Sequence, residues 1–407
     1  AKNLGLTNGV VYIRGGDIKH RDDTDVELVF RQESNFYYLT GCAEPGAHVL
    51  YDLKTNKATL FVYQLTPHEL VWDGLQPTLA KIQEEYDLDD DAIVQARIYK
   101  SEYEIEIMRR INKISSDAHI ALMKAVKTAR SEGDLDALFR YETARAGARI
   151  QAYKPIVGAG ANASTLHYGR NTSSFATRPE DNNSCRSNDD SLLVLVDAGA
   201  ELDCYASDIT RTYPVQGQFS EDAKVLYSIV LEMQKTVLGA LRPGVEWEAM
   251  HRLAGKVAVE GLQRAGVLKQ GYSVQEMLEH HVDGLFFTHG LGHMIGLDVH
   301  DVGGYPRGVE RLQAPGIKYL RMRRPLEAGF VVTVEPGVYF TEYLLEEARR
   351  DERRSKYVDW DVVSSRFMKL GGVRIEDSVV ITETGIDNLT VVPKEIEEIE
   401  AILAGRA

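Results

Sequence analysis

The sequence is poor in cysteine and has no long apolar run. Its three cysteines, Cys42, Cys185 and Cys204, are odd in number, widely separated and without the CxxC spacing of a thiolate zinc site. This usage argues against a disulfide framework and fits a reducing compartment, so we expect a cytoplasmic protein. No stretch approaches the roughly 18 consecutive apolar residues of a membrane-spanning helix. Residues 1–8 show no signal-peptide pattern, so we expect no membrane association.

Basic residues are also in deficit, with 47 lysines and arginines against 61 aspartates and glutamates, for a formal net charge of −14. We therefore expect neither nucleic acid nor an anionic membrane as a partner. Of the 407 residues, 44% are hydrophobic and 27% are charged, which is typical of a folded globular protein. At about 150 residues per domain, this length suggests two or three domains.

The first ninety residues contain short β-rich runs, such as Val10–Arg14, 36–39, 49–52 and 58–63. They predict a small mixed α/β domain over residues 1–95. A segment dense in acidic residues, 84–91, precedes the expected boundary and is read as solvated surface.

A long helical pattern begins near Ser101, which forms a capping-box spacing with Glu104. It opens a second domain over residues 96–407. Helical segments there, such as 220–241, alternate with strand-like runs. The fold class predicted for this domain is therefore α+β.

Two of those strand-like runs carry an aspartate each. Asp197 follows the apolar run 192–196, and Asp208 lies in the run 204–212. If the runs form a hairpin centred on Leu202 and Asp203, the two carboxylates are directly opposite on one face. Like charges in that position need a proton, a cation or a metal. The pattern weakly favours a metal, and one turn aspartate plus one solvated aspartate is the open alternative.

Two glutamates occupy comparable places further along. Glu335 ends the apolar run 331–334, and Glu376 lies in an alternating run, 373–382, among residues of its polar face. A strand-end salt bridge explains the first equally well, and an exposed sheet face explains the second.

Three of the chain's 11 histidines, His289, His293 and His300, fall within twelve residues. The glycines between them, Gly290, Gly292 and Gly296, make a regular helix costly at about 1 kcal/mol each relative to alanine, so a strand or tight turn is expected. A lone histidine is more often a packed residue than a ligand, but three beside glycines, with four carboxylates elsewhere, favour a metal site.

These segments resemble the metallopeptidase family with the pita-bread fold, which contains prolidase, aminopeptidase P and methionine aminopeptidase. The resemblance is carried by HGLGHMIGLDVHD from His289, VDAG from Val196, SDITRT from Ser207, VEPG from Val334 and GGVRIED from Gly371, in family order. Within the family, DVGGYPRGVER, EPGVYF and LEEA resemble prolidases. Prolidases of this type have a larger amino-terminal domain, and the join at 91–96 is abrupt by comparison.

The resemblance implies a pita-bread catalytic domain with two divalent metal ions, of which Asp208 and Glu376 are the bridging ligands. The implied ligands are Asp197, Asp208, His293, Glu335 and Glu376. Independently, one imidazole and four carboxylates are a hard, oxygen-rich set that favours Mn2+, with Zn2+ or Co2+ as alternatives. Two such ions are expected to activate a bridging hydroxide that hydrolyses an amide bond.

By resemblance, His289 supports the tetrahedral intermediate, His167 and His300 face the substrate, and Glu335 shuttles a proton toward the leaving nitrogen. Arg374 matches the family's cation behind the bridging carboxylates, with an ordinary salt bridge as the alternative.

Arg321 matches the arginine with which prolidases hold the carboxylate of a C-terminal proline, a role for which a guanidinium is suited. Without the resemblance it is read as solvated. We therefore expect a metal-dependent Xaa-Pro dipeptidase that assembles as a homodimer and takes small peptides. The alternatives are aminopeptidase P, which acts on longer Xaa-Pro peptides, and a non-catalytic peptide-binding module.

Overall fold

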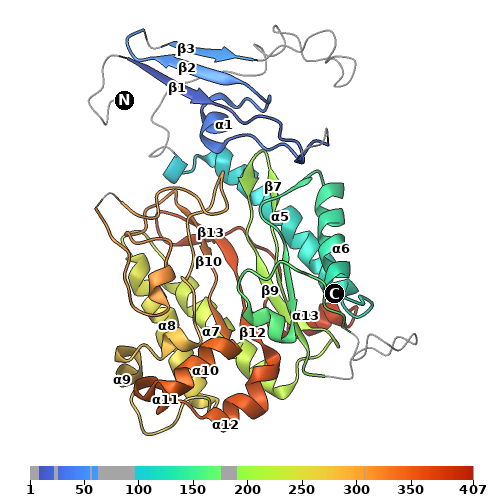
Figure 1. Ribbon diagram of the computed structural model, residues 1–407, viewed down its shortest axis with the longest axis vertical. Helices are drawn as coiled ribbons and strands as arrows, with labels where there is room; N and C mark the ends of the chain where they lie inside the picture. Colours follow the sequence, from blue (N-terminus) through green and yellow to red (C-terminus); the bar gives the residue numbers. More distant parts are fainter. Residues whose placement is uncertain are drawn as a thin grey trace. The chain divides into compact units, whose positions relative to one another are not determined.

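The computed structural model describes residues 9–22, 26–55, 57–62, 97–175, 190–306 and 308–406 (Figure 1). The chain forms two compact units, Ala1–Ile98 and Tyr99–Ala407, with their boundary three residues beyond the expected one. The acidic segment 84–91 and the join at 91–96 lie outside the described residues. No helix of the described residues has both the length and the apolar character needed to cross a membrane.

The described residues of the first unit include a three-stranded antiparallel sheet in the order β1-β2-β3 and a short helix. Its elements are β1 (Val10–Arg14), α1 (Ser34–Thr40), β2 (His48–Asp52) and β3 (Lys57–Phe61). The strand expected over 36–39 is wrong, because this segment is α1. Glu33 caps the helix by accepting the Phe36 backbone N–H, and Gly41 ends it with a φ of 62°. The aromatic residue Phe36 packs into the core of this unit from the helix, where it contacts Cys42, Ala47 and Val49.

The second unit has two halves of similar construction. In the first half, two helices pack on small antiparallel sheets, β5-β6-β9 and β4-β7-β8. Its elements are α5 (Glu102–Ala125), α6 (Glu132–Arg145), β4 (Ile150–Gln151), β5 (Ile156–Ala159), β6 (Leu193–Asp197), β7 (Ala200–Leu202), β8 (Tyr205–Ala206) and β9 (Thr210–Pro214). The predicted capping box is confirmed, since the Ser101 and Glu104 side chains each accept the other residue's backbone N–H.

The second half repeats this plan with sheets β10-β13-β14 and β11-β12. Its principal elements are α7 (Glu221–Ala240), α8 (Trp247–Arg264), α9 (Val274–Glu279), β10 (Val331–Val334), β11 (Gly337–Tyr339), α10 (Glu342–Arg350), α11 (Glu352–Ser355), α12 (Trp360–Val362), β12 (Gly372–Arg374), β13 (Asp377–Ile381), β14 (Ile386–Asn388) and α13 (Ile396–Leu403). Figure 1 shows the strands of both halves between α5 and α6 on one side and α7 and α8 on the other.

The run 373–382 is not one strand. It divides into β12 and β13, which pair with β11 and β10 respectively. At the division, Glu376 forms a β-bridge with Thr210 at the start of β9. This bridge joins the two halves, and it brings the acidic residues of both halves to one place.

Candidate active site

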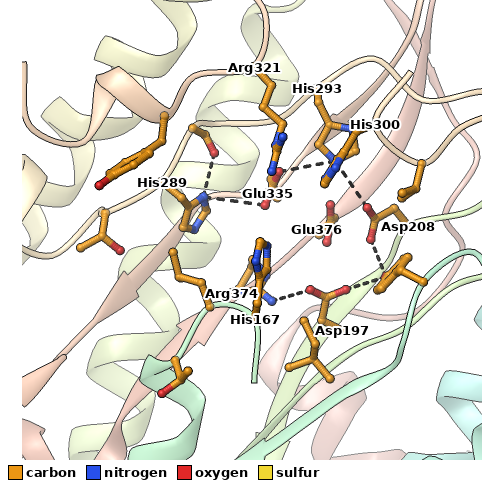
Figure 2. Close-up of a pocket in the computed structure, with 18 of the residues that line it drawn as sticks. His167, Asp197, Asp208, His289, His293, His300, Arg321, Glu335, Arg374 and Glu376 are labelled. Atoms are coloured by element: carbon orange, nitrogen blue, oxygen red, sulfur yellow. Dashed lines mark hydrogen bonds and ion pairs between the residues drawn. The ribbon is translucent and has the colours of Figure 1, made fainter. Parts of the chain in front are cut away.

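One cavity of about 820 Å³ in the second unit is lined by every site residue that the sequence predicted (Figure 2). Its lining includes His167, Asp197, Asp208, His289, His293, His300, Arg321, Glu335, Arg374 and Glu376. We call Asp197, Asp208, His293, Glu335 and Glu376 the donor cluster, and His167, His300 and Arg321 the substrate rim. The two groups differ in burial and in bonding.

Asp197 and Asp208 lie on the same face of the hairpin, but not directly opposite one another. Asp197 pairs with Thr210 in the ladder, so the predicted register is wrong by two residues. The cause is the turn: Asp203 and Cys204, with φ values of 49° and 62°, form its tip, one residue later than expected. Both carboxylates are nonetheless buried, with exposed fractions of 9% and 6%, which overturns the solvated alternative.

The two aspartates meet at a side chain that sequence reasoning missed. The Tyr153 hydroxyl lies 2.5 Å from Asp197 Oδ1 and 2.5 Å from Asp208 Oδ1. A phenol has one hydrogen and can donate to only one carboxylate at a time. The other short contact requires a proton on an acid, or a cation that draws both carboxylates together.

His293 presents one ring nitrogen to the carboxylates. Its Nδ1 lies 3.0 Å from the Met294 carbonyl and must donate to it, which leaves the lone pair on Nε2. That Nε2 lies 3.4 Å from Asp208 Oδ2 and 3.7 Å from Glu335 Oε1. Burial lowers the pKa of His293 to about 4, so the imidazole is neutral near pH 7. A neutral imidazole with a free Nε2 is the form that binds a metal.

Glu376 is only 1% exposed, so the exposed-face alternative is wrong. Its carboxylate accepts a 2.6 Å hydrogen bond from the Thr210 hydroxyl across the bridge between the two halves. Glu335 follows β10, and its backbone N–H donates to the Leu291 carbonyl. This contact places the Glu335 side chain beside the histidine segment.

If every carboxyl group of the donor cluster were ionised, the cluster would hold more negative charge than its surroundings balance. Burial, with Asp197, raises the pKa of Asp208 well above its ordinary value, and burial with Asp208 does the same for Glu376. Burial, reinforced by Glu376, also raises the pKa of Glu335. The nearby cation Arg374 opposes these shifts without cancelling them.

The donor atoms fit a divalent cation. One atom each of Asp208, His293 and Glu376 lies within 4.8 Å of the others, and all three residues are buried. Two carboxylates and an imidazole are ligands that such ions accept. Asp197 and Glu335 border this group, Asp197 through the shared Tyr153 hydroxyl and Glu335 through His293. The excess negative charge and the free Nε2 of His293 are what a bound cation would satisfy.

Arg374 is buried and connects the donor cluster to His289. Its guanidinium donates to Asp197 Oδ2 at 2.6 Å, to the Thr210 hydroxyl at 3.1 Å and to the Tyr339 hydroxyl at 2.7 Å. Tyr339 in turn bonds to His289 Nε2 at 2.8 Å, while His289 Nδ1 donates to the Gly290 carbonyl. Burial lowers the pKa of His289 to about 3, so its ring is neutral.

The substrate rim is exposed, in contrast to the donor cluster. His167, His300 and Arg321 all have exposed side chains that line the cavity. Figure 2 shows Arg321 extending into the cavity from the side that bears Glu335 and His293. The His300 ring stands edge to face against His293, with centroids 4.5 Å apart.

Tyr153 and Tyr339 were not nominated from the sequence. Tyr153 precedes β5 in a segment without a motif, so only the folded contacts identify it. Tyr339 had a weak signal, since it is a polar aromatic in the EPGVYF segment, four residues after Glu335. It ends β11 and is fully buried.

Comparisons with known proteins agree with this geometry. Residues 106–383 match the model of metallopeptidase family M24, and residues 1–96 match the aminopeptidase P N-terminal domain. The first match spans more than half of the chain, so the chain belongs to metallopeptidase family M24. This confirms the predicted fold class, a pita-bread catalytic domain preceded by a smaller domain, and the predicted class of enzyme, a metallopeptidase.

Relatives carry two different activities in their names. The human Xaa-Pro dipeptidase is 39% identical over 458 residues, which cover 99% of this chain and 90% of the human protein. A probable Xaa-Pro aminopeptidase of Verticillium alfalfae is 39% identical over 440 residues, which cover 97% of this chain and 92% of that protein.

Solved structures point to the same fold. Zinc-substituted aminopeptidase P of E. coli, in complex with product, matches with a TM-score of 0.78 and 29% identity, covering 98% of this chain and 94% of that one. Aminopeptidase PepP of Pseudomonas aeruginosa matches with a TM-score of 0.76 and 31% identity, covering 98% and 95%. Overall similarity therefore does not separate a dipeptidase from an aminopeptidase.

Proposed function

We propose that this chain is a metal-dependent Xaa-Pro dipeptidase, which hydrolyses the imide bond of dipeptides ending in proline. The observation that carries the proposal is Arg321. Its exposed guanidinium lines the cavity of the donor cluster, and within the described part of the chain no carboxylate forms an ion pair with it. A guanidinium in that state is available to bind a substrate carboxylate through two parallel hydrogen bonds.

The donor cluster would hold the divalent metal ions, with Asp208, His293 and Glu376 at its centre and Asp197 and Glu335 beside them. Its oxygen-rich composition supports Mn2+, and Zn2+ or Co2+ are the alternatives. When bound, such ions act as Lewis acids and lower the pKa of water at the site toward neutrality. Arg374 donates a hydrogen bond to Asp197 at 2.6 Å, and this contact would hold the carboxylate in position as a ligand.

Glu335 is the proposed proton carrier. Burial raises its pKa well above the ordinary value, which makes this carboxylate a better proton acceptor than an exposed glutamate. In this role Glu335 takes a proton from the attacking water and delivers it to the proline nitrogen. An amide nitrogen leaves as a neutral amine only after that transfer.

The proposed role of His289, to support the tetrahedral intermediate, needs one change in its contacts. Both ring nitrogens bond within the protein, to the Gly290 carbonyl and the Tyr339 hydroxyl. One of these bonds must open before His289 can donate to a substrate oxygen. His167 and His300 have no such requirement, because their exposed rings already face the cavity.

Aminopeptidase P activity is the second candidate, and it is favoured by the names of the fungal and bacterial relatives. A non-catalytic peptide-binding module is disfavoured, because all five residues of the donor cluster are present. A homodimer and a cytoplasmic location complete the proposal; the first rests on the resemblance to prolidases and the second on the scarcity of cysteine.

The test is hydrolysis of Gly-Pro and Gly-Pro-Gly by protein stripped of metal and reloaded with Mn2+. Cleavage of Gly-Pro alone, restored by metal, supports the dipeptidase. Cleavage of Gly-Pro-Gly moves the assignment to aminopeptidase P. Inactivity on both, with metal shown to be bound, overturns both candidates.

A further inference from the structure

The backbone that carries Arg321 is held unusually closely on two sides. A β-carbon on Gly290 would lie 2.8 Å from the Leu320 Cα, and one on Gly304 would collide with the Arg321 carbonyl oxygen. The Arg323 backbone N–H also donates to the Gly304 carbonyl at 2.8 Å. Residues 320–323 are therefore packed between the histidine segment and the segment that begins at Gly303.

Two side chains of that second segment converge on one atom. The Tyr305 hydroxyl and the Arg311 guanidinium both donate to the Leu320 carbonyl oxygen, each at 2.7 Å. The Arg311 guanidinium also lies over the Tyr305 ring, 4.9 Å from its centroid. The two donors thus support one another, and together they use both lone pairs of the carbonyl that directly precedes Arg321.

We propose that Tyr305 and Arg311 are positioning residues that aim Arg321 at the substrate carboxylate and so set the preference for dipeptides. This inference rests on the proposed function. The Leu320 carbonyl belongs to the peptide unit that ends at the Arg321 nitrogen, so fixing its direction fixes the start of the Arg321 side chain. A long flexible side chain loses less entropy on binding when its base is already fixed. Neither Tyr305 nor Arg311 lines the cavity, so they act through Arg321 and not by touching the substrate.

The experiment uses full-length, metal-loaded Tyr305→Phe and Arg311→Met, assayed on Gly-Pro and on Gly-prolinamide, which has the same imide bond without the carboxylate. Loss of one such hydrogen bond predicts a KM for Gly-Pro raised about threefold to tenfold, with kcat nearly unchanged. Kinetics on Gly-prolinamide should be unaffected. Arg145→Gln, which removes an exposed pair with Glu142 on α6, is the matched control and should leave the kinetics on both substrates unchanged.

Each variant is then combined with Arg321→Ala. If Tyr305 and Arg311 act through Arg321, their substitution has no further effect on Gly-Pro once Arg321 is gone. Effects that persist in the Arg321→Ala background, or equal losses on both substrates, overturn the inference. Tyr305→Phe removes one oxygen atom, and unchanged melting and metal content show that the fold is intact. Failure of wild-type protein to cleave Gly-Pro overturns the proposed function instead, and that result is visible before any variant is compared.

Discussion

The donor cluster and the substrate rim share one cavity but are built in opposite ways. Asp197, Asp208 and Glu376 are buried, and hydroxyl or guanidinium groups from other strands and loops bond to them. The Arg321 side chain is exposed, and only the backbone beneath it is held. If the proposed function is correct, packing fixes the metal-binding part of the site, whereas selectivity would depend on side chains that contribute little to the fold. Substitutions in the donor cluster should therefore lower metal content, whereas substitutions in the rim should weaken substrate binding.

Asp208→Asn should have the largest effect. The substitution removes a carboxylate that is itself a proposed metal ligand. Loss of a residue that only supports a ligand costs about 10–100-fold in metal affinity or activity, so a greater loss is expected for Asp208→Asn. Metal content measured by mass spectrometry should fall together with kcat. Asp203→Asn, at the exposed tip of the same hairpin, is the control and should retain both; retained activity in Asp208→Asn would remove Asp208 from the cluster.

Arg321→Ala should separate the rim from the cluster. A hydrogen bond to a charged group contributes roughly 1.5–3 kcal/mol, so the KM for Gly-Pro should rise on the order of 10–100-fold while metal content is unchanged. Arg145→Ala is the control, because the exposed Arg145 side chain pairs with Glu142 on α6 and does not line the cavity. Parallel loss of metal and substrate affinity would mean that Arg321 is structural.

Metal binding by the cluster should depend on pH. The raised pKa values of Asp208, Glu335 and Glu376 mean that the metal-free protein holds protons there, which a metal must displace. Affinity should therefore fall about tenfold per pH unit of acidification for each proton displaced. Calorimetry in buffers of different ionisation enthalpy measures that release. Binding without proton release would show that the cluster is already ionised.

The same pKa shifts predict how the stability of the metal-free protein changes with pH. At pH values above about 3.8 to 4.5, the ordinary pKa values of these carboxyl groups, the native state binds more protons than the unfolded state. The cluster's contribution to the free energy of unfolding must then decrease as pH rises through that window. Asp208→Asn should weaken this dependence in chemical denaturation of metal-free protein, and an unchanged slope would contradict the assignment.

Tyr153→Phe should have the smallest effect. It removes the hydroxyl shared by Asp197 and Asp208 and leaves every proposed ligand in place. A single hydrogen bond contributes about 1 kcal/mol, so metal affinity should change less than tenfold. The metal-free protein should lose more melting temperature than the loaded protein, because bound metal takes over the attraction between the carboxylates. Equal losses in both forms would show that Tyr153 serves the fold alone.

Sequence patterns pointed to residues that the structure brings into one cavity. Asp197 and Glu335 stand in or after apolar strand-like runs, and His293 lies in the histidine segment. The hairpin register was missed because it depends on the turn at Asp203 and Cys204, whose positive φ values no residue type there demanded. Tyr153 was missed because it joins the site only through tertiary contact. The helix at Ser34–Thr40 was missed because its caps outweigh the strand preference of its aromatics.

The most direct test of the account compares Gly-Pro with Gly-prolinamide in wild type and in Arg321→Ala, both loaded with Mn2+. If Arg321 reads the carboxylate at a metal-dependent site, wild type should strongly prefer Gly-Pro, and the variant should lose that preference through a lower kcat/KM on Gly-Pro alone. An unchanged preference in the variant, or equal losses on both substrates, would contradict the division of the cavity into a donor cluster and a selective rim.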